Sequence, residues 1–354
     1  MSKELKPPSV IVKFFSVTLV KWQKHHGRHD LPWQMSLDPY SVWLSEIMLQ
    51  QTQVATVKEY FLRFMQKFPT LKHLARASND EVMSLWSGLG YYSRAKNLHA
   101  CAQRIAKDYK GEFPKTVLEL QELPGIGPST AAAIASLCFG SREAILDGNV
   151  KRVLTRILAF SGDMTSSVQV KNLFQIAQVL LPDKKSDMPV YTQGLMDLGA
   201  TVCTPKKPSC TTCPMSKICV SHRNQIVETF PVKTKKIKRS AQSIWLLMLR
   251  NAQTQIYLEK RNAIGIWANL YCLPAFESDE KLLESVPVQY RKKAFFREPF
   301  LHVLTHKDLY LHVVEIKNAK PLLKQPGKWL TPAEWKSMGL PAPIRQLLVD
   351  ESKN

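Results

Sequence analysis

Residues 123–131 read Leu-Pro-Gly-Ile-Gly-Pro-Ser-Thr-Ala, and this stretch decides the fold of the first two thirds of the chain. Two glycines in so short a turn, with helical patterns on both sides, predict two short helices joined by a tight hairpin. Thr116 and Glu119 have the spacing of a capping box at the start of the first helix, and Gly140 ends the second. The hairpin would present backbone N–H groups at a helix N-terminus, an arrangement that binds a phosphate without reading sequence.

The hairpin predicts a contact with a nucleic-acid backbone through Gly125, Gly127 and the following Ser129. The alternative is a helix–helix turn whose glycines only permit close packing. The stretch Leu146-Asp147-Gly148-Asn149-Val150 favours the first interpretation, because a carboxylate shortly after a phosphate-binding hairpin lies close to a distorted nucleotide. We expect Asn149 and Lys151, which follow this carboxylate, to contact DNA as well; for Lys151, a phosphate or surface contact is the favoured role.

Four cysteines, Cys203, Cys210, Cys213 and Cys219, follow with the spacing C-x6-C-x2-C-x5-C. Four thiolates within so short a stretch can close around one metal centre. Tetrahedral zinc sites usually combine two close pairs of ligands, whereas this stretch has only one close pair. The wider gaps favour a 4Fe-4S cluster over zinc, and both over four unrelated buried thiols.

The composition indicates a partner that is a polyanion. The chain has 354 residues, a formal net charge of +20 and a sequence pI near 9.6, and 45% of its residues are hydrophobic. This length allows two domains with separate cores, and the charge fits nucleic acid. An anionic membrane surface would fit the charge too, but no apolar run predicts a spanning helix or a signal peptide. The odd number of cysteines left over argues against a disulfide framework and for a reducing compartment.

The chain divides into two domains by the period of its hydrophobic pattern. Residues 1–222 are predicted to be mainly helical, including the hairpin at 116–140 and the cysteine loop at 203–219. A helix is expected from Asp38-Pro39 to about Val54, with Asp38 as its N-cap. Residues 223–240 form a basic linker, and residues 241–350 alternate as strands with short helices, which predicts an α+β domain.

These motifs together resemble the helix-hairpin-helix DNA glycosylase superfamily. Three further stretches resemble the adenine DNA glycosylases of the MutY type: Leu31-Pro32-Trp33 with Val42–Val54, Gly88-Leu89-Gly90-Tyr91-Tyr92, and Met196-Asp197-Leu198-Gly199-Ala200. The resemblance runs from about Leu31 through Val220 and continues more weakly to the C-terminus. It implies a mainly α glycosylase domain with an iron–sulfur loop, followed by an α+β Nudix-like domain. It also implies excision of adenine paired with 8-oxoguanine or guanine.

Two carboxylates make chemical sense of that activity. The predicted helix places Glu46, Leu49, Gln50 and Gln53 on one face, and apolar neighbours would raise the pKa of Glu46 and keep a proton available. Glu46 would protonate adenine at N7, because the adenine anion is a poor leaving group. Asp147, held anionic, would stabilise the positive charge that develops on the sugar. Asp147 could also be a helix N-cap, and the two roles are compatible.

Position 129 decides between two reactions. Relatives of the endonuclease III type carry a lysine there, which forms a Schiff base with the sugar and leads to strand cleavage. This chain has Ser129, so we expect simple hydrolysis. Lys151 is the residue expected to give any weak lyase activity.

Several side chains are expected to hold the distorted duplex, because an enzyme that acts on a base must take that base out of the stack. By resemblance, Gln51 and Tyr91 intrude into the DNA, with Tyr91 beside the oxidised guanine, and Trp33 and Gln193 line the adenine pocket. Gln50 is expected at the same DNA-facing surface.

The C-terminal domain resembles the Nudix-like domain of the family, on the stretch from Gly265 to Pro274. Nudix hydrolases hold magnesium with a glutamate-rich helix, and the acidic residues that follow Pro274 here do not have the spacing of that helix. We therefore expect the Nudix fold without Nudix hydrolase activity. A Phe-Ser-His loop touches 8-oxoguanine in the family, and the corresponding residues here are Leu304, Thr305 and His306. A polar turn that binds nothing is the alternative for this loop.

The sequence therefore predicts a monofunctional adenine DNA glycosylase, expected to be a monomer in a bacterial cytoplasm, that acts on double-stranded DNA with 8-oxoguanine:adenine or guanine:adenine mispairs. Two alternatives stay open. A bifunctional lyase on oxidised pyrimidines conflicts with Ser129, and a non-catalytic iron–sulfur DNA-binding protein leaves Glu46 and Asp147 unexplained.

Overall fold

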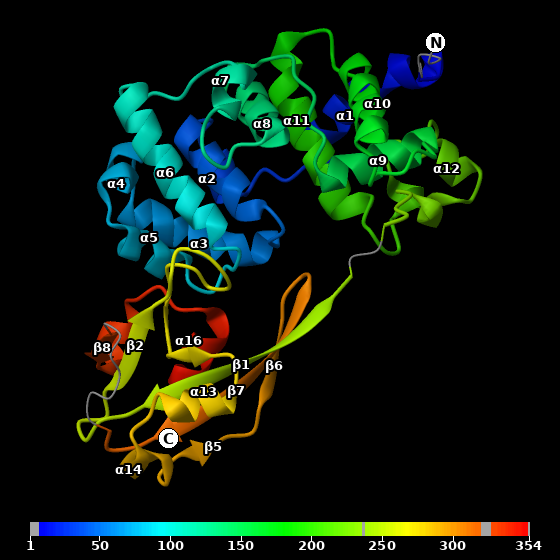
Figure 1. Cartoon of the computed structure of the whole chain (residues 1–354). Coiled ribbons are helices and arrows are strands. Elements are labelled where there is room, and N and C mark those ends of the chain that lie inside the picture. Colours follow the sequence, from blue (N-terminus) through cyan, green and yellow to red (C-terminus); the bar gives the residue numbers. More distant parts are fainter. Residues whose placement is uncertain (1–6, 236–237, 320–326, 353–354) are drawn as a thin grey trace. The chain divides into compact units, whose positions relative to one another are not determined.

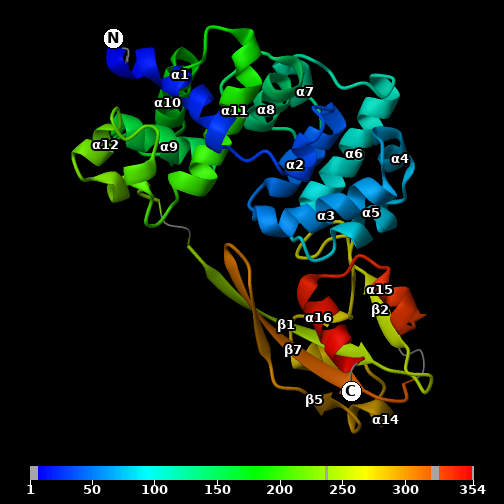
Figure 2. The same ribbon diagram turned by 180° about the vertical axis from the view of Figure 1, so that it is seen from behind.

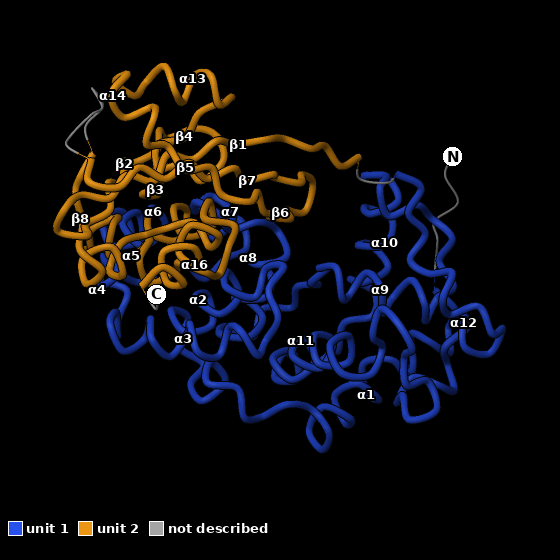
Figure 3. The backbone as a smooth tube through the Cα atoms, turned by 90° about the horizontal axis from the view of Figure 1, so that it is seen from below, with its two compact units in different colours: residues 1–75, 100–236 blue, residues 76–99, 237–354 orange. Residues whose placement is uncertain are grey.

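A computed structural model of the chain describes residues 7–235, 238–319 and 327–352. They divide into two compact units, which Figure 3 colours separately. The first unit combines residues 1–75 with residues 100–236, and the second combines residues 76–99 with residues 237–354. The helix α6 (Ser93–Asp108) therefore begins in the second unit and ends in the first. The division is thus not a single cut between an N-terminal and a C-terminal part.

The first unit is built from helices and long connecting loops (Figure 1). Besides the end of α6, its helices are α1 (Ser9–His26), α2 (Pro39–Leu49), α3 (Val54–Lys67), α4 (Leu71–Arg76), α7 (Val117–Gln121), α8 (Pro128–Phe139), α9 (Gly148–Leu158), α10 (Ser167–Val179), α11 (Met188–Asp197) and α12 (Val220–Arg223). A π-helical turn over Leu198–Val202 continues α11 into the cysteine loop. The expected mainly helical character of this region is confirmed.

The helix α8 lies between α2 and α11, and α1 lies against the other side of α11 (Figure 2). The apolar face of α1 carries Phe15 and Leu19, which are fully buried in a core shared with α9 to α11. Met215 and Cys219 belong to the same core and Cys203 packs against it, so the loop with the cysteines is packed against the helices from both of its ends. Burial of this apolar surface stabilises the arrangement. The sequence did not predict α1, because its apolar run is interrupted by Lys13.

The second unit contains two small sheets and short helices (Figure 1). Its strands are β1 (Ser240–Leu249), β2 (Ile256–Lys260), β3 (Tyr271–Cys272), β4 (Ala275–Phe276), β5 (Phe295–Phe296), β6 (Phe300–Val303), β7 (Lys307–Ile316) and β8 (Gly327–Leu330). Its helices are α5 (Asn79–Trp86), the start of α6, α13 (Asp279–Glu284), α14 (Val288–Arg291), α15 (Pro332–Lys336) and α16 (Ala342–Glu351). The expected α+β class of this region is confirmed.

The long strands β1 and β7 pair in parallel over their whole lengths and form the centre of the larger sheet. In that sheet β4 pairs with β1, and both β5 and β6 pair with β7, all antiparallel. The smaller sheet has the order β3-β2-β8. Leu247 of β1 and Val314 of β7 are fully buried in a core with Leu282 of α13. The side chains of one face of β1 and β7 therefore form the core of this unit.

The segment 76–99 is held to the rest of the second unit by specific contacts. The hydroxyl groups of Ser87 and Tyr92 both donate to the carbonyl of Leu340, each at 2.8 Å. Lys260 forms an ion pair with Asp80 at 2.6 Å. These contacts place the stretch Gly88–Tyr92 in the same unit as the strands β6 and β7.

Candidate active site

A pocket of about 700 Å³ opens in the first unit between α2, α8, α9 and α11. A volume of this size is typical of sites that hold a small organic group. Among the residues predicted to act on DNA, those that line it are Trp33, Glu46, Gln50, Gln51, Ser129, Asp147, Asn149 and Gln193. The pocket thus brings together side chains that are far apart in the sequence, in a place where one base could be held.

Glu46 reaches this pocket from the middle of α2. The helix begins as predicted, because the Asp38 carboxylate accepts the backbone N–H of Ser41 at 3.0 Å. Its neighbours Trp43, Ile47 and Met48 are buried, so the carboxyl group has little contact with water. Burial, with a smaller contribution from the charge of Asp147, raises the pKa of Glu46 to about 7. A fraction of the Glu46 side chains therefore carries a proton at neutral pH.

Asp147 faces the same pocket at the start of α9 and is its N-cap, as predicted. Its Oδ1 accepts the backbone N–H of Val150 at 2.7 Å. Burial raises the pKa of Asp147, while the N–H groups of Val150 and Asn149 and the charges of Arg152 and Lys151 oppose that rise. The N–H groups and cations beside Asp147 favour its ionised form, whereas burial and the charge of Asp147 favour the protonated form of Glu46.

The helix α2 is shorter than the sequence predicted. It ends at Leu49, and Gln51 takes a backbone conformation with φ 58°, in the left-handed region. The prediction that Gln50 and Gln53 share a helical face with Glu46 is therefore wrong, since both follow the end of the helix. The turn nevertheless returns Gln50 and Gln53 to the pocket that Glu46 lines. Residues 50–53 read Gln-Gln-Thr-Gln and include neither glycine nor proline, so the sequence did not show the break.

The hairpin between α7 and α8 has the predicted form. Ile126 is buried and anchors it, while Gly125 and Gly127 lie on either side. Gly125 has φ 78°, which favours glycine, but Gly127 has φ −85° and a Cβ there would meet no atom within 4 Å. The fold itself therefore does not require glycine at 127. An outside group that approaches the backbone closely would require it.

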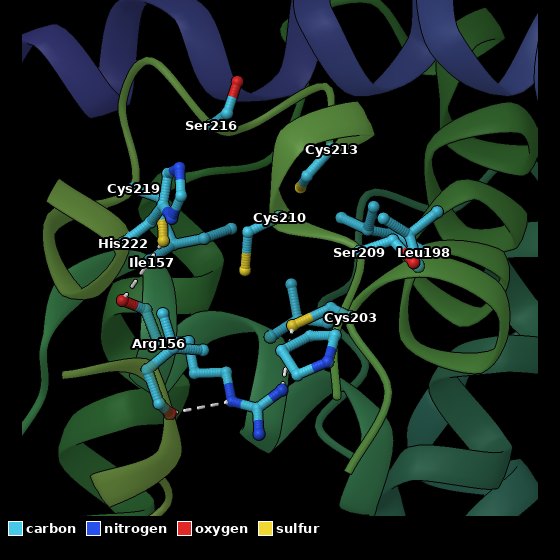
Figure 4. Close-up of a pocket in the computed structure, with 14 residues that line it drawn as sticks. Arg156, Ile157, Leu198, Cys203, Ser209, Cys210, Cys213, Ser216, Cys219 and His222 are labelled. Atoms are coloured by element: carbon cyan, nitrogen blue, oxygen red, sulfur yellow. Dashed lines mark hydrogen bonds between the residues drawn. The ribbon is translucent and has the colours of Figure 1, made fainter. Parts of the chain in front are cut away.

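The four cysteines line a single cavity, together with Arg156 and His222 (Figure 4). Figure 4 shows the four sulfur atoms facing the same space. Burial raises the pKa of the Cys213 thiol to about 12, and the neighbouring cysteines contribute to the rise. Within the part of the chain that the structure describes, no three His, Cys, Asp or Glu side chains converge on one metal ion. The sulfurs thus surround a space instead of meeting at a point.

Arg156, on α9, holds the cysteine loop in place although it is only 2% exposed. Its guanidinium donates to the carbonyl groups of Thr204, Pro205, Val227 and Phe230, at 2.7 to 3.2 Å. One of its nitrogens also lies 3.5 Å from the Cys203 sulfur. These hydrogen bonds fix both sides of the cysteine loop to α9, the helix that Asp147 caps. No pattern in the sequence indicates this role for Arg156.

The remaining predicted residues lie elsewhere. Lys151 is not among the residues that line the pocket, although its charge opposes the rise in the pKa of Asp147. Tyr91, Thr305 and His306 line a pocket of about 740 Å³ within the second unit, where the Tyr91 hydroxyl and the Thr305 hydroxyl are hydrogen-bonded. His302 and Trp267 line it too and were missed, because neither stands in a motif that predicts binding.

No helix in the described ranges of the chain has both the length and the apolar character needed to cross a membrane.

Residues 44–178 match the HhH-GPD superfamily of base excision DNA repair proteins, and residues 245–350 match the NUDIX domain. An adenine DNA glycosylase of Buchnera aphidicola subsp. Acyrthosiphon pisum (strain APS) is 36% identical over 349 residues, which cover 96% of this chain and 98% of that protein. The adenine DNA glycosylase of Homo sapiens is 46% identical over 218 residues, which cover 59% of this chain and 39% of that protein.

Among solved structures, a thermostable thymine-DNA glycosylase is similar to this chain, with a TM-score of 0.52 and 30% identity, over 60% of this chain and 97% of that one. An endonuclease III in a non-covalent complex with DNA shares the fold at a TM-score of 0.51 and 22% identity, over 62% of this chain and 98% of that one. The family predicted from the sequence is confirmed: the chain belongs to the adenine DNA glycosylases, enzymes of base-excision repair with a helical HhH-GPD region and a Nudix-like C-terminal region.

Proposed function

We propose that this enzyme hydrolyses the N-glycosidic bond of adenine paired with 8-oxoguanine or guanine in duplex DNA and leaves an abasic site. The observation that carries the proposal is that the carboxyl groups of Glu46 and Asp147 face one pocket, where burial raises the pKa of Glu46 to about 7 and N–H groups and cations favour the ionised form of Asp147. Two carboxyl groups of opposite protonation state are what glycosidic hydrolysis uses. The double-stranded DNA of a bacterial cytoplasm is the proposed site of action.

In this mechanism Glu46 donates its proton to N7 of the extruded adenine. The C1′–N9 bond then breaks with its electron pair moving to the base, which leaves as neutral adenine. Asp147 stabilises the positive charge on the sugar. Water adds its oxygen to C1′ and gives up a proton, which restores Glu46. Each carboxyl group ends the cycle in the state in which it began.

The proposed DNA contacts have independent support in the first unit. In the hairpin a Cβ at Gly127 would meet no atom within 4 Å, which leaves room for a phosphate, and the net charge of +20 favours a polyanion. Gln51, with its left-handed backbone, lies at the pocket where it could fill the space of an extruded base. In the second unit, the side chains of Tyr91, Thr305 and His306 line a pocket that we assign to the 8-oxoguanine.

We propose that Cys203, Cys210, Cys213 and Cys219 hold a 4Fe-4S cluster. The residues fit the group, because four sulfurs surround one cavity and the Arg156 guanidinium and the Ser221 hydroxyl lie 3.5 Å from two of them. Such N–H and O–H groups stabilise the negative charge of cluster sulfurs. When bound, the cluster would supply cross-links between parts of the loop and a site for one-electron transfer. Iron and acid-labile sulfide measured in the purified protein test this assignment against zinc.

The function is tested by a single-turnover assay on a duplex with one central 8-oxoguanine:adenine pair. A matched duplex carries an oxidised pyrimidine, and products are resolved with and without alkali. Cleavage at the adenine that appears only after alkali supports the proposal. Alkali-independent cleavage at the pyrimidine supports a lyase instead, and cleavage of neither duplex supports a protein that only binds DNA.

The rate of excision is expected to fall as the pH rises above about 7, because Glu46 then loses the proton that it donates. Single-turnover rates measured with saturating enzyme across neutral and alkaline pH should drop about tenfold for each unit above the pKa. A Glu46→Gln variant has no such group and its residual rate should not follow this curve. A wild-type rate that stays level well above neutral pH would remove Glu46 as the acid.

A lysine at position 129 is expected to convert the enzyme into a lyase. Ser129 lines the pocket and its Oγ accepts the backbone N–H of Leu146 at 3.3 Å, next to Asp147. A Ser129→Lys amine would reach the same space and attack the sugar carbon. Borohydride should trap the variant on DNA as a covalent complex, whereas the wild type and Ser129→Met should give none. Absence of a trapped complex with Ser129→Lys would show that this side chain does not reach the sugar.

A further inference from the structure

A fully buried carboxylate lies behind the pocket and has no part in the mechanism above. Asp197 is the last residue of α11 and is 0% exposed. Its Oδ1 accepts from Arg28 Nε at 2.8 Å and lies 2.7 Å from Arg28 Nη2, while its Oδ2 accepts the backbone N–H of Arg28 at 2.9 Å. A buried charge is tolerated only with such compensation, which the Arg28 guanidinium provides.

Asp197 also contacts a side chain of the pocket directly. Gln193, one helical turn earlier on α11, donates from Nε2 to Asp197 Oδ1 at 2.9 Å. Both Gln193 and Arg28 line the pocket, whereas Asp197 does not. Asp197 is therefore placed to fix the positions of two side chains that face the bound base.

The chemistry of the carboxylate decides which end of the Gln193 amide faces it. An ionised carboxylate only accepts hydrogen bonds, so the amide must turn its NH₂ group toward Asp197. The Gln193 carbonyl oxygen is thereby directed away from Asp197, as an acceptor. Without the carboxylate, the amide could turn over and present a donor instead.

We infer that Asp197 is a positioning residue that makes the pocket selective for a purine with a 6-amino group. This inference rests on the proposed function, since it assumes that the extruded base lies beside Gln193. A 6-amino group donates and would be accepted by the fixed carbonyl oxygen of Gln193. A 6-keto group only accepts, so that two oxygens would face each other and the base would be rejected.

The test compares single-turnover excision from duplexes in which 8-oxoguanine is paired with adenine or with hypoxanthine, the 6-keto analogue. Asp197→Asn keeps the shape of the side chain but replaces a carboxylate, which only accepts hydrogen bonds, with an amide that can also donate. The ratio of the adenine rate to the hypoxanthine rate should therefore fall by about tenfold or more. Asp183→Asn makes the same change at a fully exposed position and should leave the ratio unchanged. In a Gln193→Leu background, Asp197→Asn should have no further effect on the ratio.

The outcomes separate the two proposals. If the wild type excises neither base, the proposed function fails. If it excises adenine and Asp197→Asn leaves the ratio unchanged, or lowers both rates equally, the inference about Asp197 is overturned.

A measurement on the wild type covers the case in which Asp197→Asn does not fold. In protein labelled with ¹⁵N-glutamine, the side-chain amide signal of Gln193 is identified as the one that is absent from the Gln193→Leu variant. In the wild type this signal should show slow hydrogen exchange. Fast exchange of that signal would overturn the inference.

Discussion

Replacing Glu46 with glutamine is expected to lower the single-turnover rate of adenine excision by about 10³-fold while binding of the mispaired duplex is retained. Glutamine has the size of glutamate and keeps the contacts of α2, but it has no proton that it can transfer to N7. The retained affinity follows because the proposed phosphate contacts come from the hairpin at Gly125 and Gly127 and not from α2.

The matched control is Gln53→Glu, which places a carboxyl group elsewhere on the lining of the same pocket. In the double variant with Glu46→Gln, this carboxyl should not restore excision, because it is not held at the position of Glu46. Unchanged excision in Glu46→Gln alone would exclude the residue from proton transfer. Loss of both excision and DNA affinity would indicate a structural role instead.

The same substitution should stabilise the protein at neutral and higher pH. The raised pKa of Glu46 means that the folded state keeps a proton which the unfolded chain releases above about pH 4.5. The folded state is therefore penalised increasingly as the pH rises from about 4.5 to about 7, and by about 3 kcal/mol above that range. Glu46→Gln removes this penalty, so its free energy of unfolding should exceed that of the wild type above neutral pH and match it below the unfolded pKa.

Replacing Arg156 with leucine is expected to destabilise the first unit by about 4 kcal/mol or more. Four carbonyl groups lose their donor in a buried place, and each unsatisfied carbonyl costs about 1–3 kcal/mol. Chemical denaturation followed by circular dichroism measures the loss. Hydrogen exchange of residues 203–230 should accelerate most, because these residues receive the hydrogen bonds of Arg156.

Arg142→Leu is the matched control for this substitution. Arg142 lies in the same unit, is 44% exposed, and donates to one carbonyl, that of Pro182, at 2.9 Å. Its loss should cost about 1 kcal/mol, because water can reach the carbonyl that it leaves. Equal destabilisation by the two variants would show that the carbonyl contacts of Arg156 do not hold the loop.

The sequence predicts well those features that are determined by neighbouring residues. The hairpin, the N-caps at Asp38 and Asp147 and the left-handed Gly140 all depend on contacts within a few residues, and the structure confirms them. Glu46 was predicted as a group of raised pKa because its apolar neighbours stand beside it in the sequence. Asp147, which only the fold brings close, makes a smaller contribution to the same pKa shift.

The features that the sequence missed depend on distant contacts. Arg156 and Asp197 look like ordinary charged residues of amphipathic helices, and only tertiary packing buries them. The end of α2 was misplaced because no glycine or proline marks the break at Gln51. The hydrogen bond between Tyr91 and Thr305 joins residues from separate parts of the sequence, which local patterns cannot predict.

The passage of α6 from one compact unit to the other has a consequence for dissecting the protein. Ending the chain at residue 236 would leave residues 76–99 without the rest of their compact unit. Ser87 and Tyr92 would lose the carbonyl of Leu340, and Met83 would lose the close backbone packing of Gly339. The C-terminal third thus shares a compact unit with a segment of the helical region.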